Sequence, residues 1–224
     1  ARDLRQLQLG DATVLLHRIE DAQVDVLLER RGEGHAHVIR VYGKGLVLAV
    51  DEHGDFTGIV TMAAGALVGK LEQAPRRTVR VIAYANEEQG LYGGKAYAEA
   101  RAAAGEIDAH QLGAESDFGA GRVYALRAGV DPAAWPVLEK IGEVLAPLGV
   151  VTEREGGSPG PDVGPIVAKG ATWAQLAQDG TDYFDYHHTP NDTLDKIDPK
   201  ALDQQVAAYA VLAYLAAETE VDFG

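Results

Sequence analysis

Hydrophobic residues follow two different spacings along this chain, and the change between them comes near residue 56. Before that point, short runs rich in valine, isoleucine and leucine alternate with glycine or acidic turns, at residues 13–19, 24–30, 37–42 and 46–50. Short runs of this kind between turn residues are typical of strands. This part of the chain therefore predicts three or four strands, with antiparallel pairs among them.

After residue 56 the hydrophobic residues recur at helical spacing. The pattern from Thr57 to about Glu72 predicts a mostly buried helix, which Pro75 then ends. The run Thr-Val-Arg-Val-Ile-Ala-Tyr at 78–84 predicts a strand directly afterwards. Strand, helix and strand in this order indicate a βαβ unit with parallel strands.

The rest of the chain alternates the same two patterns. Further helices are predicted from Gly93 past Arg101, from Pro132 to about Leu148, near 163–169, and from Pro199 to about Glu218. Further strands are predicted at 112–117, 122–127, 150–152 and 172–176, and a polar loop at 178–193. This alternation predicts an α/β fold, with one domain over residues 1–224 built as a three-layer α/β/α sandwich around a mixed, mostly parallel sheet.

Charge and cysteine content exclude several classes of function. The chain has 34 acidic against 20 basic residues, a net charge of −14, which argues against nucleic acid or an anionic membrane as partner. No hydrophobic run approaches the roughly 20 residues that span a bilayer, and residues 1–20 lack the layout of a signal peptide. Cysteine is absent, so only histidine and carboxylates are available as strong metal ligands.

Two adjacent acids, Glu87 and Glu88, follow the predicted strand 78–84. Acids at the end of a buried strand are costly unless their charge is offset, and a metal ion is the usual offset. Neighbouring side chains on an extended segment point to opposite sides, so one acid would bind a metal while the other acts on water. The simpler alternative is that the pair opens a helix, where acids suit the positive end of the dipole.

Two more polar loops follow predicted strands, and in α/β sheets the active groups gather at such strand ends. The loops contain Asp117, within Glu-Ser-Asp, and the pair His187-His188, followed by Thr-Pro-Asn-Asp-Thr. Glu, Asp and His are the ligands of a catalytic zinc site that keeps one position open for water, so the loops predict metal-assisted hydrolysis. Taken singly, Asp117 is also explained as a turn cap and the histidines as part of a solvated loop.

Four segments resemble the co-catalytic zinc aminopeptidases and carboxypeptidases, in the branch of the plasma glutamate carboxypeptidases. They are 86–97 (NEEQGLYGGKAY), 115–119 (ESDFG), 160–165 (GPDVGP) and 178–195 (QDGTDYFDYHHTPNDTLD). Their order and spacing match the family, and the resemblance covers roughly residues 56–218. It implies the zinc-exopeptidase form of the α/β/α sandwich.

The resemblance also implies roles for seven side chains of this sequence. These are Glu87 as general base, Glu88, Asp117 and His188 as zinc ligands, and Asp162, Tyr186 and His187 as lining of the substrate cleft. It further implies one or two zinc ions, a peptide or dipeptide as substrate, and a secreted or periplasmic location. A homodimer is compatible with it.

The resemblance breaks down upstream of Phe56. The family has a His-x-Asp motif whose histidine binds one zinc, and a second motif whose first aspartate bridges both ions. In this chain the His-x-Asp is missing and the bridging position falls on Gly54. Asp55, at the next position, is the substitute metal ligand that we expect, with Asp51 and His53 as alternatives.

Two hypotheses of function are therefore open. The first is a zinc-dependent exopeptidase-like hydrolase with Glu87 as base. The second is a catalytically inactive homologue that serves as a binding or structural module, because losing a histidine and a bridging carboxylate removes much of what holds two divalent ions together. A third, a generic α/β binder of carbohydrates or small molecules, leaves the pattern at 178–195 unexplained.

Overall fold

The computed structural model describes residues 28–29, 37–40, 47–50 and 56–224. In the first three of these ranges lie the strands of a small antiparallel sheet, β1 (Leu28–Glu29), β2 (His37–Arg40) and β3 (Val47–Val50), in that order. The antiparallel pairing predicted for this part of the chain is confirmed. The predicted strand at 13–19 lies outside the described residues.

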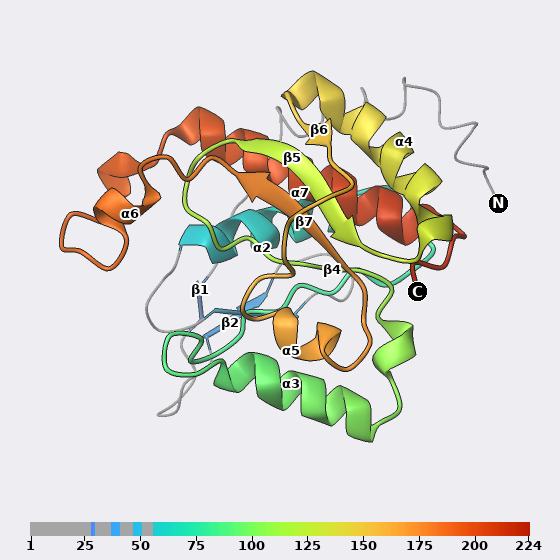
Figure 1. Cartoon of the computed structure of the whole chain (residues 1–224). Helices are drawn as coiled ribbons and strands as arrows, with labels where there is room; N and C mark the ends of the chain where they lie inside the picture. Colours follow the sequence, from blue (N-terminus) through green and yellow to red (C-terminus); the bar gives the residue numbers. More distant parts are fainter. Residues whose placement is uncertain (1–27, 30–36, 41–46, 51–55) are drawn as a thin grey trace.

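A second sheet runs through the middle of the molecule (Figure 1) in the order β4-β7-β5-β6. Its strands are β4 (Gly113–Ala114), β5 (Val123–Gly129), β6 (Val151–Thr152) and β7 (Trp173–Gln178). The pairs β4–β7 and β5–β6 are parallel, whereas β5–β7 is antiparallel. The predicted α/β fold with a mixed sheet is therefore confirmed.

Helices cover both faces of this second sheet. One core holds α2 (Phe56–Gly69), α4 (Trp135–Leu145) and α7 (Pro199–Glu218), and the other holds α3 (Tyr92–Ala103) and α5 (Gly164–Val167). Neighbours on a strand point to opposite faces, and Ala174 of β7 belongs to the first core while Trp173 packs against the second. Figure 1 shows α3 and α5 together below the sheet and α4 above it. The three layers are the predicted ones.

Capping residues in the sequence mark where α7 and the helical segment containing α4 begin. Asp198 precedes α7 and accepts a hydrogen bond from Lys200 N at 3.0 Å, and Pro199 occupies the first helical position. Ahead of α4, Asp131 caps a 3₁₀ turn at Pro132–Ala134 in the same way, at 2.8 Å from Ala133 N. The predicted helix to about Leu148 is α4 with this turn before it and another, Ala146–Leu148, after it.

The predicted strand 78–84 is wrong, because these residues form no strand in the structure. A strand needs a hydrogen-bonded neighbour, and β4 pairs with β7 alone among the described strands. Both 78–84 and the end of β4 instead line one cavity. Alternation of side chains made the segment resemble a strand without supplying a partner, so the βαβ unit expected around α2 is not formed by the described residues.

Short helical turns interrupt segments that the sequence pattern leaves as loops. The predicted loop 178–193 contains α6 (Tyr183–Tyr186), and 3₁₀ turns lie at Ile107–Ala109 and Leu194–Lys196. A single turn is too short to show hydrophobic periodicity, which explains why these elements were not predicted.

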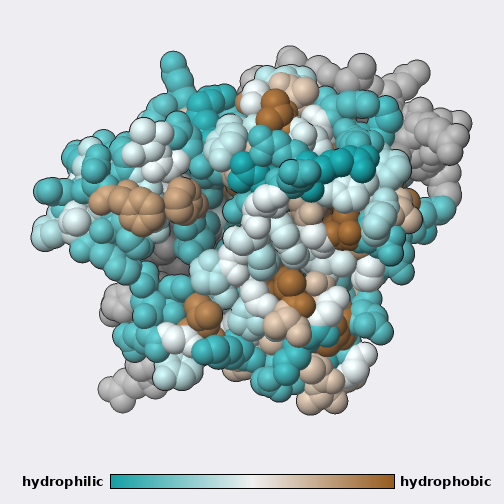
Figure 2. All heavy atoms as spheres, viewed as in Figure 1, coloured by the Kyte–Doolittle hydropathy of each residue, from teal (hydrophilic) through white to brown (hydrophobic). Residues whose placement is uncertain are grey.

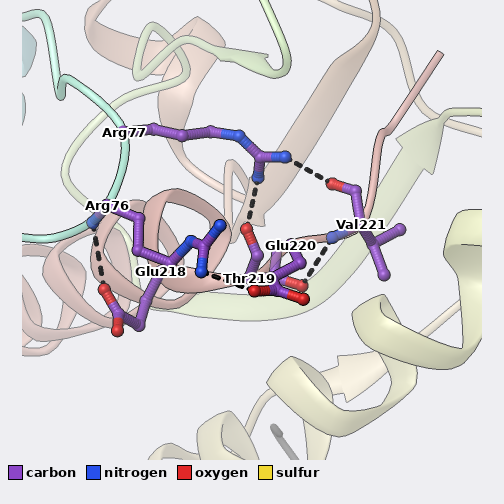
Figure 3. Close-up of polar contacts among 6 residues, drawn as sticks. All are labelled: Arg76, Arg77, Glu218, Thr219, Glu220 and Val221. Atoms are coloured by element: carbon purple, nitrogen blue, oxygen red, sulfur yellow. Dashed lines mark hydrogen bonds and ion pairs between the residues drawn. The ribbon is translucent and has the colours of Figure 1, made fainter. Parts of the chain in front are cut away.

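Two arginines fix the start of the 78–84 segment to the end of α7 (Figure 3). Arg77 donates through Nη1 to Thr219 O at 2.7 Å and through Nη2 to Val221 O at 2.8 Å. Arg76 donates its backbone N–H to Glu218 Oε2 at 3.0 Å, and its side chain pairs with Glu220 at 2.6 Å. Arg77 Nη1 also donates to Ala216 O at 3.2 Å, so a carbonyl in the last turn of α7, which has no partner within the helix, meets a cation.

Across the part of the chain that the structure describes, every helix is too short or too polar to cross a membrane.

Candidate functional site

One cavity of about 1990 Å³ collects every predicted site residue that the structure describes. Its walls come from the segment 76–84, the end of β4, the loop containing α6, and one side of α7. The predicted residues that line it are Glu87, Glu88, Asp117, Asp162, Tyr186, His187 and His188. Asp55 and its alternatives Asp51 and His53 lie outside the described residues. The three polar loops therefore meet. Two of them follow the strands β4 and β7, as expected for strand ends of an α/β sheet, whereas the loop with Glu87 and Glu88 follows a segment that forms no strand.

Glu88 and His188 are in contact although they lie 100 positions apart in the chain. His188 Nε2 is 3.0 Å from Glu88 Oε1, and the two side chains are 61% and 62% exposed. Hydrogen bonding to Glu88, together with its negative charge, raises the pKa of His188 above the usual value. The pair forms the centre of the candidate site.

The backbone on both sides of this contact is held in the left-handed region. His188 has a φ of +58°, and Asn86, directly before the two glutamates, has a φ of +56°. This conformation costs energy for residues other than glycine and is frequent at functional sites. After His188, the Thr189 hydroxyl donates to Tyr186 O at 2.7 Å and accepts from Asn191 N at 3.2 Å, which closes the predicted tight turn.

Glu87 and Glu88 lie in a turn that precedes α3. The helix begins at Tyr92 and has no acidic residue in its first turn, so the alternative that the two acids open it is wrong. Gly90 N and Leu91 N donate to Glu87 O at 3.0 and 2.9 Å and close the turn. Both acids thus stay at the cavity wall and do not serve as a helix N-terminus.

The Glu88–His188 pair fits a metal ion in donor type and in spacing. Two ligands of a tetrahedral zinc with bonds of about 2.0–2.1 Å lie about 3.3 Å apart, close to the distance between these two atoms. Among the described residues, no third histidine or acid stands near enough to form a group of three. Glu88 and His188 therefore supply two donors, and Asp117 shares their cavity without joining them.

Glu115, two residues before Asp117, is a half-buried acid to which no role was assigned from the sequence. Its Oε2 accepts from Asp162 N at 3.0 Å and Val163 N at 2.8 Å. Burial raises its pKa to about 8, against the effect of these two hydrogen bonds, and the charges of Asp117 and Asp162 raise it further. The signal in the sequence was an acid placed before Ser-Asp at a buried strand end.

A stack of rings leads away from His188. His187 lies 3.8 Å from His188 and 4.5 Å from Tyr183 between ring centroids, and Tyr183 lies 4.6 Å from Phe118. Phe118 and Phe184 are 42% and 75% exposed. Figure 2 shows a largely hydrophilic face with separate hydrophobic patches, one of them on the α6 side. Tyr183 and Phe118 were not predicted, although Phe118 directly follows Asp117 and Tyr183 lies three residues before Tyr186.

Comparison with known proteins gives the same picture of the chain. A family model described as peptidase family M28 matches residues 55–213. Carboxypeptidase Q of Rattus norvegicus is 30% identical over 172 residues, which is 77% of this chain and 35% of that protein. The chain thus spans about a third of the length of the curated relatives that it matches.

Solved structures extend the likeness to three dimensions. A peptidase M28 precursor from Shewanella amazonensis is 40% identical with a TM-score of 0.71, over 88% of this chain and 48% of that one. Legionella pneumophila LapA, at 14% identity and a TM-score of 0.52 over 94% of this chain and 65% of that one, shares the fold. Because the family model covers most of the sequence, including all three polar loops of the cavity, the chain belongs to peptidase family M28.

Proposed function

We propose that this chain carries the catalytic part of a metal-dependent exopeptidase that hydrolyses a terminal peptide bond of a peptide or dipeptide. The observation that carries the proposal is the contact of Glu88 with His188, beside Glu87, in a cavity that also holds Asp117. Membership of family M28 and the likeness to carboxypeptidase Q support the same class of reaction.

Each residue has a distinct part in the proposed reaction. Glu88 and His188 would hold the metal, joined by Asp117 from the same cavity and by Asp55 as the further ligand that the sequence offers. A bound zinc ion lowers the pKa of water to about 7 and polarises a carbonyl oxygen. Glu87 takes a proton from the attacking water and gives it to the leaving nitrogen as the C–N bond breaks, so it ends in its starting state.

The substrate would bind in the same cavity, close to the two glutamates. Asp162, Tyr186 and His187 are among the residues that line it. Tyr186 and His187 offer aromatic surface, and Asp162 offers a carboxylate, so together they suit a peptide with a polar backbone and an apolar side chain.

The second hypothesis, an inactive homologue, rests on a specific observation. Only two donors are within contact distance among the described residues, and the upstream segment lacks the His-x-Asp of the family. Such a protein would keep the cavity and bind a peptide without cleaving it.

The test is zinc content combined with release of amino acids from dipeptides and short peptides, sampled at both ends. We expect zinc to be bound and Glu87→Gln to abolish release while zinc content is unchanged, because Glu87 is the base and not a ligand. Glu155→Gln, an exposed acid outside the cavity, is the matched control and should keep full activity. Zinc binding without hydrolysis favours the inactive homologue, and no binding at excess zinc overturns the proposal.

A further inference from the structure

We infer that Glu115 is a positioning residue, whose carboxylate ties the Glu87–Glu88 turn and the Asp117 loop together through the segment 160–163. The inference rests on the proposed function for its meaning, since these are the two walls that would hold the metal. Three sets of contacts, each called a link below, connect these two walls.

The first link joins the end of β4 to the segment 160–163. Glu115 Oε2 accepts two backbone hydrogen bonds, from Asp162 N at 3.0 Å and Val163 N at 2.8 Å, across 47 and 48 positions of sequence. Gly160 has a φ of +86°, and a Cβ built there would lie 3.0 Å from Glu115 Oε1 and closer still to the rest of the carboxylate. The segment thus folds directly around the Glu115 carboxylate.

The second link joins the same segment to the Glu87–Glu88 turn. Gly94, buried in the first turn of α3, approaches so closely that a Cβ there would lie 2.7 Å from Asp162 O. Gly93 N donates to Ala85 O at 2.8 Å, which closes the chain around the two glutamates. Any shift of Asp162 therefore moves the start of α3, and with it the turn that carries Glu87 and Glu88.

The third link fixes Glu115 itself. Tyr209 of α7, 4% exposed, donates its hydroxyl to Glu115 O at 2.5 Å. Ser116, the next residue, is buried, and Gln178 Nε2 lies 3.5 Å from the Ser116 hydroxyl. The backbone that leads to Asp117 is therefore fixed to the core. The Glu115 side chain in turn fixes the segment 160–163, which contacts the start of α3.

Only one of the two carboxylate oxygens of Glu115 makes the hydrogen bonds to the segment 160–163. Glu115 Oε1 is buried and makes no hydrogen bond within the described part of the chain. Only Oε2 has to be replaced, and a glutamine carbonyl oxygen accepts the same two N–H groups. Glu115→Gln should therefore keep the tie, whereas Glu115→Ala leaves both N–H groups without their acceptor.

The first measurement needs no metal. We expect Glu115→Ala to speed hydrogen exchange of the amides at 160–163 and also at 87–91, and Glu115→Gln to restore slow exchange at both. Gln204→Ala is the control, because Gln204, which is more deeply buried than Glu115, likewise bonds backbone groups, those of Val123, away from the cavity. Faster exchange at 160–163 alone, or the same response to Gln204→Ala, overturns the inference.

The second measurement is zinc affinity by competition with a chromogenic chelator. We expect Glu115→Ala to weaken it by roughly 10–100-fold, as is typical when the support of a metal ligand is lost. Glu115→Gln should restore the zinc affinity. Gln204→Ala should lower the melting temperature and leave the zinc affinity unchanged. Equal zinc affinity of wild type and Glu115→Ala overturns the inference. A wild type without zinc binding overturns the proposed function alone, and the exchange experiment then decides the tie.

Discussion

At the scale of single residues, the site depends on short-range restraints within the loop that carries its histidines. The Thr189 hydroxyl bridges Tyr186 and Asn191, and His187 stacks on His188. Further along the same loop, Asp195 accepts from the Thr193 hydroxyl and pairs with Lys196, both at 2.5 Å. These contacts hold one loop conformation without burying the loop, and those of Asp195 depend on its ionisation.

We expect Asp195 to lose its contacts at low pH. Hydrogen bonds from Lys196 and Thr193 lower its pKa to about 2, against roughly 3.9 in an unfolded chain. Because the folded-state pKa is the lower one, the contacts stabilise the loop above about pH 4 and are lost as the pH falls towards 2. The titration midpoint of the Asp195 carboxyl carbon, followed by NMR, should lie near this pKa. In Lys196→Ala the midpoint should rise, and a wild-type midpoint near 4 contradicts the assignment.

At the scale of elements, side chains fix both ends of α7. The Asp198 side chain caps its start, and Arg77 donates to three carbonyls near its end, those of Ala216, Thr219 and Val221. Phe223, fully buried just beyond, donates to Gln111 and accepts from Asp131 N. The chain end is thus built into the core next to the segment that leads to Glu87.

Replacing Arg77 should therefore destabilise the fold. We expect Arg77→Ala to lower the free energy of unfolding by about 2–4 kcal/mol, because hydrogen bonds to a charged group contribute about 1.5–3 kcal/mol each and do not add fully. Urea denaturation measures the loss. Lys140→Ala, which removes the exposed pair with Glu143 at 2.7 Å, is the control and should cost less than about 1 kcal/mol. Equal losses from both changes contradict the role given to Arg77.

The elements that the sequence predicts well are those whose pattern is long and local. The helices α2, α3, α4 and α7 agree with the predicted ranges to within a few residues, because hydrophobic spacing and a capping acid or proline define them. The prediction of a strand at 78–84 was wrong because a strand also needs a hydrogen-bonded neighbour, which the pattern of the segment itself does not reveal. The short helix α6 was not predicted because four residues are too few to show hydrophobic periodicity.

At the scale of the whole molecule, the fold brings distant loops to one cavity. The approach of the loops after β4 and β7 was predictable from the rule that strand ends meet, whereas the Glu87–Glu88 turn follows no strand. The roles of all three loops came from a resemblance to a family. The 3.0 Å contact between Glu88 and His188 was not predictable, since no local pattern relates positions 100 residues apart. The assignment of ligands and base, and of one domain over residues 1–224, stays a prediction.

Metal binding should stabilise the whole fold through this pair. A ligand that binds only the folded state at 100 times its dissociation constant adds about 2.7 kcal/mol, so zinc should raise the melting temperature by several degrees and a chelator should reverse the rise. In His188→Ala the rise should vanish. In His110→Gln, which changes a histidine bonded to Tyr97 at 2.7 Å, the rise should persist. Equal responses of both variants contradict the ligand assignment.

The long sequence separation of Glu88 and His188 also constrains when the site forms during synthesis. A chain emerging from the ribosome as far as α5 already contains both glutamates and Asp117, but it lacks His188. Closing the loop between residues 88 and 188 has an entropic cost that packing of α7 and β7 must first offset. We therefore expect metal capture through this pair only after these elements have packed, and fragments that end before the His-His-Thr-Pro turn are expected to remain in the apo form.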